Sequence, residues 1–380
     1  MGGLGDLLEL LHGAGDRWTT VRLALRTWSD SDLMRQAMQR HARASNSRGA
    51  TVVTSSRGHR GGPSTWEATV RAWLDRPGDR RRIEVTDGHG ERLTVQAGER
   101  WWSYMPLIGS MSNEGDPEVG TGGGAEYDWL VEPWSLVPGL ALEPVGAVEV
   151  AGREAIDVRA TPRPFDPRLG FVAHLAPGAD EVALAVDRER GVVLRCESRL
   201  DGRPFTLHEV TEIAFDEPLA DDLFRFESPD GSPVRSPRET YARPEPVSIE
   251  EAARRASFTV LVPTRLPRGW GVDALYSPAG DRPARRDWVT LHVRPEDRMA
   301  PRLRLHQSAT PMDDMLDWEQ VDHRGRRILL YRSGMPGTTW EAKIEGHGTH
   351  VRASGDLDRE AVLEIVSSLE PAPRHLPPIG

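Results

Sequence analysis

Apolar and polar side chains alternate along the first third of the chain, in short stretches separated by turn residues. In the first of these stretches Val70, Ala72 and Leu74 alternate with polar or larger neighbours. A period of two is typical of a strand with one buried face, and the Pro-Gly, Asp-Gly and Ala-Gly pairs between the stretches are typical of tight turns. The pattern predicts an antiparallel meander with strands at Ala68–Leu74, Arg81–Thr86, Arg92–Gln96 and Trp101–Tyr104.

Helical and strand patterns flank this meander. Leucines spaced three and four apart predict a helix at Leu4–Leu11, and a similar stripe predicts a second helix at Asp30–Ala44. The apolar segment Tyr127–Leu142 has no strand period, which predicts a short helix or lid that covers hydrophobic surface. Further strands are predicted at Trp18–Trp28, Val145–Val150, Ala155–Ala160, Glu181–Asp187, Val192–Leu200 and Pro204–Phe215.

A proline-rich stretch divides the chain into two predicted domains. Residues 229–246 contain five prolines among Gly, Ser and Arg, a composition typical of a linker. Beyond it, a capping box at Ser248–Glu251 begins a helix, eight strands follow, and Asp358–Leu369 forms a last helix with one apolar face. We therefore expect an α+β protein with a first domain at 1–228, the linker at 229–246, an antiparallel sheet with helices on one face at 247–372, and a tail at 373–380.

Composition excludes some classes of function. The net charge of −10 over 380 residues argues against nucleic acid as a partner, because phosphate binding needs clustered cations. No stretch reaches the roughly 18 apolar residues of a membrane helix. The N-terminus carries acidic residues where a secretory signal carries cations, which predicts a cytoplasmic protein. The single cysteine, Cys196, lies in a strand and is expected to be buried rather than reactive.

The common catalytic and cofactor motifs are missing from the sequence. It contains no HExxH, no GxSxG, no Walker loop and no dinucleotide-binding fingerprint. The acidic residues Glu114, Asp116 and Glu118 lie in a glycine-rich stretch, but their spacing does not match a calcium loop. His208 and Glu209 are neighbours on a strand, so their side chains face opposite ways. The sequence therefore predicts no enzyme, no metal and no cofactor.

Tryptophan is the residue type that stands above background, with twelve in the chain. One interpretation is that the tryptophans fill the core of a wide, curved sheet. The other is that they line a cavity for an apolar ligand, since Trp and Tyr combine large apolar area with a polar edge. On the strand of the central meander Trp102 and Tyr104 share one face, and Trp101 and Met105 share the other. The sequence leaves open which of these pairs faces the inside.

A series of strand ends and turns recurs over residues 3–230: the helix-then-strand opening at Leu4–Trp28, Trp73–Pro77 leading to Arg82–Glu84, Gly98 with Trp102–Tyr104, Leu184–Asp187 with Gly191, and Leu223–Phe226. This arrangement resembles the LolA-like fold of outer-membrane lipoprotein carriers and the related RseB/MucB sigma-factor regulators. The resemblance implies a strongly curved antiparallel half-barrel whose concave side is covered by helices and holds acyl chains or a lipidated peptide. It also implies an extracytoplasmic protein, and the two-domain layout resembles that of RseB.

Together these observations predict a non-enzymatic protein that binds an apolar or lipid-like ligand in the concave face of the first domain. The residues expected to contact the ligand are Trp73, Trp102, Tyr104, Trp129 and Trp134. The alternative is a regulatory protein–protein interaction module, RseB-like, that acts through the second domain.

Overall fold

The computed structural model describes residues 3–46, 65–115, 127–163, 178–240, 244–278, 286–296, 302–311, 318–332 and 339–372. These residues form two compact units, one built from residues 3–41 and 65–240 and the other from residues 244–372. Each unit is organised around its own antiparallel sheet and its own cluster of buried apolar side chains. The predicted α+β class, with mostly antiparallel strands and few helices, is confirmed.

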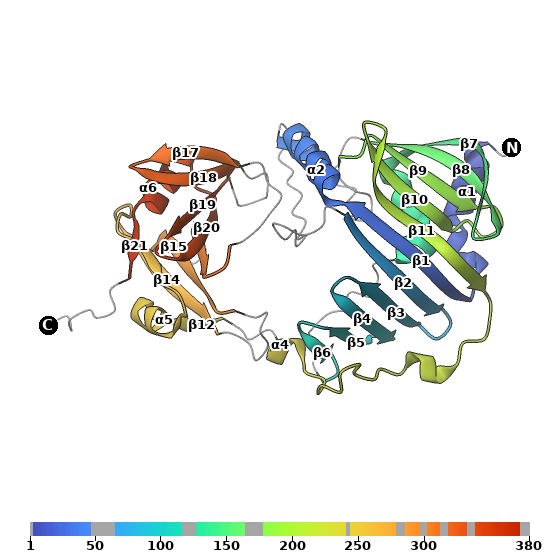
Figure 1. Cartoon of the computed structure of the whole chain (residues 1–380), viewed down its shortest axis with the longest axis horizontal. Coiled ribbons are helices and arrows are strands. Elements are labelled where there is room, and N and C mark those ends of the chain that lie inside the picture. Colours follow the sequence, from blue (N-terminus) through green and yellow to red (C-terminus); the bar gives the residue numbers. More distant parts are fainter. Residues whose placement is uncertain are drawn as a thin grey trace. The chain divides into compact units, whose positions relative to one another are not determined.

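The first unit is a single curved sheet of eleven strands (Figure 1). Its strand order is β6-β5-β4-β3-β2-β1-β11-β10-β9-β8-β7, and each neighbouring pair is antiparallel. The chain starts in the middle at β1, winds out to the edge strand β6, and returns from the other edge, β7, to lie beside β1 again. The strands are β1 (Thr20–Asp30), β2 (Thr65–Asp75), β3 (Arg80–Asp87), β4 (Gly90–Ala97), β5 (Arg100–Met105), β6 (Gly109–Ser112), β7 (Leu140–Val150), β8 (Arg153–Pro162), β9 (Glu181–Asp187), β10 (Val193–Leu200) and β11 (Arg203–Phe215).

Two-residue turns join some consecutive strands of the sheet into antiparallel hairpins. Ala151 and Gly152 have φ of +52° and +70°, and Asp201 and Gly202 have φ of +50° and +74°. Two successive positive φ angles are the signature of the turn whose twist matches an antiparallel hairpin, and Gly or Asp tolerates this conformation best. Both turns lie where the sequence predicts them.

The helices of the first unit precede β1, join β1 to β2 and β6 to β7, or follow β11, and all except α2 have nine residues or fewer. They are α1 (Leu4–His12), η1 (Ala14–Arg17), α2 (Ser31–Asn46), α3 (Asp128–Val131), η2 (Pro133–Gly139), η3 (Asp221–Phe224) and α4 (Pro237–Thr240). Two of them, α3 and η2, belong to the connection from β6 to β7. Because β6 and β7 are the opposite edges of the sheet, this connection must cross the sheet from one side to the other. The predicted segment Tyr127–Leu142 ends earlier than expected, since Leu140 already begins β7.

The second unit has an eight-stranded sheet with order β12-β14-β15-β16-β20-β19-β18-β17, and β13 pairs separately with β21. The Ser248 hydroxyl accepts a hydrogen bond from Glu251 N at 3.1 Å and caps α5, as the sequence predicts. Its elements are β12 (Glu245–Val247), α5 (Ile249–Arg255), β13 (Leu261–Pro263), β14 (Trp270–Ser277), β15 (Trp288–Pro295), β16 (Leu303–Ser308), β17 (Glu319–His323), β18 (Arg326–Arg332), β19 (Trp340–Gly346), β20 (Thr349–Gly355), α6 (Arg359–Ser367) and β21 (Leu369–Pro371).

The described parts of the proline-rich stretch 229–246 include residues that pair with strands of the neighbouring sheets. Arg235 donates from its backbone N to Ser110 O at 3.1 Å and accepts from Ser112 N at 3.0 Å, which places it beside the edge strand β6. At its other end, Glu245–Val247 pairs with β14. The exact domain boundary stays a prediction. The tail at 373–380 and most of the acidic stretch, including Asp116 and Glu118, lie outside the described residues.

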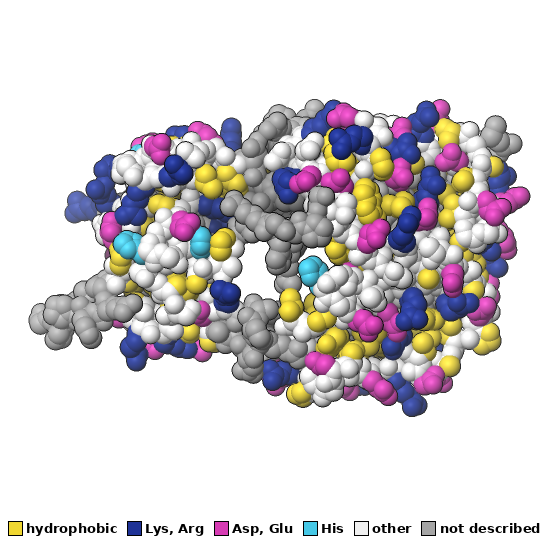
Figure 2. Space-filling model, viewed as in Figure 1, with side chains coloured by type: hydrophobic (Ala, Val, Ile, Leu, Met, Phe, Trp, Pro, Cys, Tyr) yellow, Lys and Arg dark blue, Asp and Glu magenta, His cyan; other side chains and the backbone are white. Residues whose placement is uncertain are grey.

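Within the described part of the chain, none of the helices is both long enough and apolar enough to cross a membrane. On the visible face of each unit, basic and acidic side chains are interspersed rather than gathered by sign (Figure 2).

Candidate ligand-binding site

One face of the eleven-stranded sheet carries most of the apolar side chains of the first unit. On β1, Val21, Leu23 and Leu25 are buried, whereas Arg22 and Arg26 on the other face are exposed. Residues opposite one another on antiparallel strands share a face, so the register extends this surface across the sheet. We call it the covered face, and its buried apolar members on neighbouring strands include Val70, Ala72, Leu74, Ile83, Val85, Val182, Leu184, Cys196 and Val210.

The covered face is closed by α1, α3 and η2. Leu7, Leu10 and Leu11 of α1 belong to the same buried cluster as the sheet residues. The crossing connection adds Tyr127, Trp129, Leu130, Val131 and Leu136 to that cluster. We call residues 127–139 the lid, because they pack over the sheet in the way the sequence predicts for this segment. In Figure 1, α1 lies behind the sheet.

A small number of polar contacts hold the lid. Arg81 Nη1 on β3 donates to Asp128 Oδ2 of α3 at 2.5 Å. Trp18 Nε1 lies 3.5 Å from Val131 O, at the outer limit of a hydrogen bond. The Trp129 ring meets His208 of β11 edge to face, with centroids 5.4 Å apart. The lid therefore closes on β3 at one point and on β11 at another.

Four polar or sulfur-bearing residues interrupt the apolar surface beneath the lid. Thr27 on β1 lies opposite His208 on β11, which lies opposite Cys196 on β10. Ser198 is the next residue of β10 that faces the same way. Thr27, Cys196 and Ser198 are each 1% exposed. Burial raises the pKa of the Cys196 thiol to about 12, so this thiol stays protonated and unreactive at neutral pH.

The structure separates the five residues predicted to contact a ligand. Trp129 lies on the covered face and is 3% exposed. Trp73, Trp102 and Tyr104 lie on the opposite face, because Trp73 pairs with Arg22 and Arg82, while Trp102 and Tyr104 pair with Val95 and Leu93. Trp102 and Tyr104 pack there with Phe226, in a small cluster separate from the main one. Trp134 of the lid is 58% exposed.

The same register decides which aromatic of β5 shares the covered face. Trp101 pairs with Gln96, and Gln96 pairs with Arg81, whose side chain reaches the lid. Trp101 is therefore on the side of the lid, and it is 6% exposed. Trp66 of β2 faces the same way and packs against the main cluster. Neither residue is among the ligand contacts predicted from the sequence.

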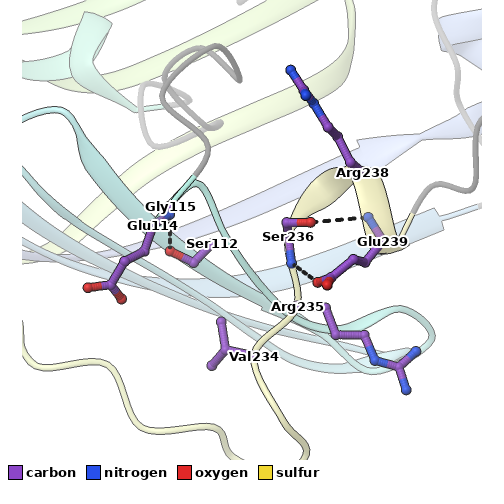
Figure 3. A pocket seen from close by; sticks show the side chains of 8 residues that line it. All are labelled: Ser112, Glu114, Gly115, Val234, Arg235, Ser236, Arg238 and Glu239. Carbon is purple, nitrogen blue, oxygen red and sulfur yellow. Dashed lines mark hydrogen bonds between the residues drawn. The ribbon is translucent and has the colours of Figure 1, made fainter.

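Two other arrangements could hold a small group, and neither suits an apolar ligand. A pocket of about 500 Å³ lies between the end of β6 and α4, and its lining includes Glu114, Arg235, Arg238 and Glu239 (Figure 3). The Glu239 carboxylate already accepts a hydrogen bond from Ser236 N at 2.8 Å, within the lining of this pocket.

In the second unit, ligand atoms of His323, Glu360 and Glu364 lie within 4.8 Å of one another. Arg324 donates to Glu364 at 2.7 Å and lowers the pKa of that carboxyl group. The carboxylate is therefore already paired with a cation of the protein.

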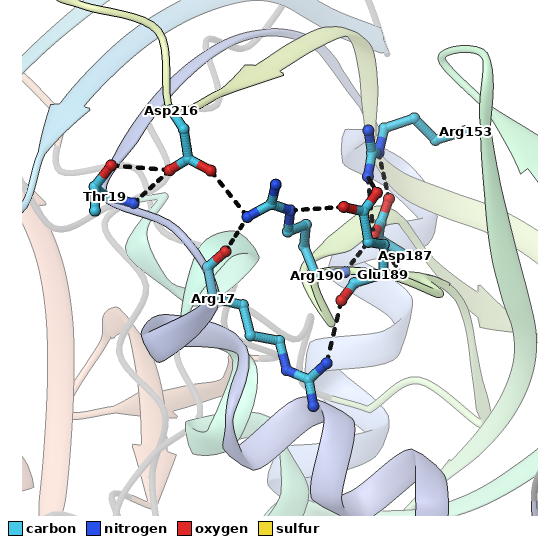
Figure 4. Close-up of polar contacts among 7 residues, drawn as sticks. All are labelled: Arg17, Thr19, Arg153, Asp187, Glu189, Arg190 and Asp216. Carbon is cyan, nitrogen blue, oxygen red and sulfur yellow. Dashed lines mark hydrogen bonds and ion pairs between the residues drawn. The ribbon is translucent and has the colours of Figure 1, made fainter.

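An ion-pair network closes the end of the sheet nearest α1 (Figure 4). Asp187 at the end of β9 is fully buried and accepts from Arg153 Nε at 2.5 Å and from Arg190 N at 2.6 Å. Arg190 Nη1 also donates to Asp216 at 2.9 Å, and Asp216 accepts from Thr19 N at 2.8 Å. The network connects the β9–β10 turn to the start of β1 and to the end of β11. We call this end of the sheet, where α1 packs, the rim.

No protein-family model matches the sequence, and no curated protein matches it either. Among solved structures the chain is similar to MucB, with 13% identity, a TM-score of 0.38, and coverage of 97% of this chain and 98% of that chain. The lipoprotein LppX of Mycobacterium tuberculosis has 12% identity and a TM-score of 0.34, over 57% of this chain and 98% of that one. LprF of Mycobacterium bovis has 10% identity and a TM-score of 0.30, over 58% and 97%.

MucB and a lipoprotein-sorting domain, which represent the groups that the sequence resembles, are among the similar structures. At 10–13% identity the likeness identifies no ligand and no partner of this chain.

Proposed function

We propose that the chain is a non-enzymatic binding protein that holds an apolar or lipid-like ligand on the covered face of the first unit. One observation carries the proposal: the wide apolar face is closed largely by a crossing connection whose helices are α3, of four residues, and η2, of seven. Helices this short have no stability of their own, because the cost of nucleation exceeds the gain from a few hydrogen bonds. The lid stays closed through the apolar side chains that it buries.

A long alkyl chain has enough apolar surface to replace the lid. Burying Trp129, Leu130, Val131 and Leu136 contributes about 6–12 kcal/mol, at about 1.5–3 kcal/mol for each side chain. An alkyl chain of about sixteen carbons contributes about 12 kcal/mol at about 0.8 kcal/mol per methylene. The two quantities are close, so a long chain competes with the lid and a short one does not. We therefore expect binding to require an opening of the lid.

Replacing Asp128 with asparagine is expected to strengthen ligand binding while weakening the closed state. The change removes the ion pair with Arg81, whose side chain is 22% exposed and whose loss is worth about 1 kcal/mol. Because the ligand binds the open state, we expect the apparent affinity for hexadecanol to rise about fivefold. Labelling of Cys196 by iodoacetamide should also become about fivefold faster, since the thiol lies beneath the lid.

The matched control is Asp273→Asn, which removes a carboxylate paired with Arg294 at 2.7 Å in the second unit. This control should leave both the affinity and the labelling rate unchanged. Weaker binding by Asp128→Asn, or equal labelling rates in the two variants, would show that residues 127–139 do not open as a lid.

A further inference from the structure

Two hydroxyl groups on the covered face are buried without a hydrogen-bond partner. Thr27 Oγ1 on β1 and Ser198 Oγ on β10 are inaccessible to solvent, and among the described residues neither has a donor or acceptor within reach. Buried hydroxyls are ordinarily bonded, and leaving one unbonded is unfavourable. Thr349 of the second unit shows the usual case, because its residue is also fully buried and its hydroxyl donates to Thr259 O.

Both hydroxyls lie in the band of strands beneath Trp129. Thr27 is directly opposite His208, whose ring Trp129 touches, and Ser198 lies on the strand on the far side of β11. Ser198 lies two residues along β10 from Cys196, which is level with Thr27, so two strand spacings and this offset separate the two residues by about 12 Å. Opening of α3 would expose this polar band in the middle of an otherwise apolar surface.

Arginines on the same face form ion pairs with carboxylates of the protein. Arg81 is paired with Asp128, and Arg92 is paired with Asp87 at 3.3 Å. An anionic head group would have to compete with a carboxylate of the protein for either arginine. A neutral group needs only the two hydroxyls, each of which both donates and accepts hydrogen bonds.

We propose that Thr27 and Ser198 form a subsite for a neutral head group of the ligand that carries several oxygens, such as a glycerol ester. The proposal rests on the proposed function, because it assumes that the ligand's apolar chain lies on the covered face. Two oxygens of one head group, one near each hydroxyl, satisfy groups that the closed protein leaves unsatisfied. The subsite therefore favours neutral amphiphiles over fatty acids of the same chain length.

The test compares two probes that share one chain, monopalmitoylglycerol and palmitate at pH 8, titrated into the full chain below their aggregation concentrations. We expect the neutral probe to bind the unmodified protein about tenfold more tightly than palmitate, the equivalent of one to two hydrogen bonds. The variant Thr27→Val with Ser198→Ala should bind both probes equally. Thr349→Val should keep the preference, because its hydroxyl lies in the second unit.

Thermal unfolding separates the subsite from a structural role. Removal of unbonded hydroxyls should leave the melting temperature of the double variant unchanged or raise it, whereas Thr349→Val should lower it. Equal binding of both probes by the unmodified protein, or a melting temperature lowered by several degrees in the double variant, would overturn the subsite and leave the proposed function standing. Failure of both probes to bind would overturn the two together.

Discussion

Replacing Asp187 with alanine is expected to lower the free energy of unfolding of the first unit by about 3–5 kcal/mol. Asp187 is fully buried, and its carboxylate accepts hydrogen bonds from Arg153, from Glu189 N at 2.9 Å and from Arg190 N (Figure 4). The alanine leaves two backbone donors unsatisfied and removes the buried carboxylate from Arg153, which keeps its ion pair with Glu189 at 3.0 Å. The measurement is urea denaturation followed by tryptophan fluorescence.

The control for this prediction is Asp216→Ala in the same network. Asp216 is more exposed, and hydrogen bonds from Thr19 are the main cause that lowers the pKa of its carboxyl group. A lowered pKa stabilises the fold at neutral pH, and this contribution is lost as the pH falls below the usual value of 3.8. We expect a clearly smaller loss of stability than for Asp187→Ala. Equal losses would mean that burial of Asp187 does not govern the rim.

Replacing Gly191 with alanine is expected to lower the free energy of unfolding of the first unit by about 2–5 kcal/mol. Gly191 has φ of +76°, and a Cβ atom there would lie 2.3 Å from Leu10 O and 3.0 Å from Leu10 C in α1. Both neighbours are backbone atoms, so they move only if α1 itself moves. The substitution therefore combines backbone strain with displacement of a helix that covers the apolar face.

Gly202→Ala isolates the strain. Gly202 has a similar φ of +74°, but a Cβ atom there would have no neighbour within 4 Å. We expect this control to lose only about 1–2 kcal/mol. Circular dichroism and thermal unfolding of the two variants give the comparison. If both melt at the same temperature, the close approach of Gly191 to α1 does not hold the helix in place.

The strands of the first unit could be predicted because their signal is local. Alternation and turn residues place β2, β3, β4 and β5 within a few residues, since each depends only on its own sequence. The face that is covered could not be predicted, because alternation is symmetrical and both faces of β5 carry a tryptophan. Trp102 and Tyr104 lie away from the lid because the connection from β6 to β7 crosses the other face, and this depends on the order of all eleven strands.

The sequence also carries signals of the candidate site. Thr27 follows Val21, Leu23 and Leu25 at the same two-residue spacing, so it lies on the buried face of its strand. Ser198 follows Leu194 and Cys196 in the same way. A polar residue at a position that alternation assigns to the buried face indicates a candidate site, because burying a polar group without a hydrogen-bond partner is unfavourable. Trp134, by contrast, belongs to an apolar segment and is nevertheless exposed.

The alternative function, a regulatory protein–protein interaction through the second unit, stays a prediction. A regulatory protein–protein interaction through this unit would involve surfaces other than the covered face, so it is compatible with ligand binding by the first unit.

Photo-crosslinking tests the central claim most directly. A hexadecanol analogue with a diazirine near the end of its chain is bound to the full protein, irradiated, and located by mass spectrometric sequencing of the labelled peptides. We expect labels on residues of the covered face and the lid, such as Leu25, Leu184 and Leu136. Labels concentrated on Trp102, Tyr104 and Phe226, or spread over the second unit, would contradict the account.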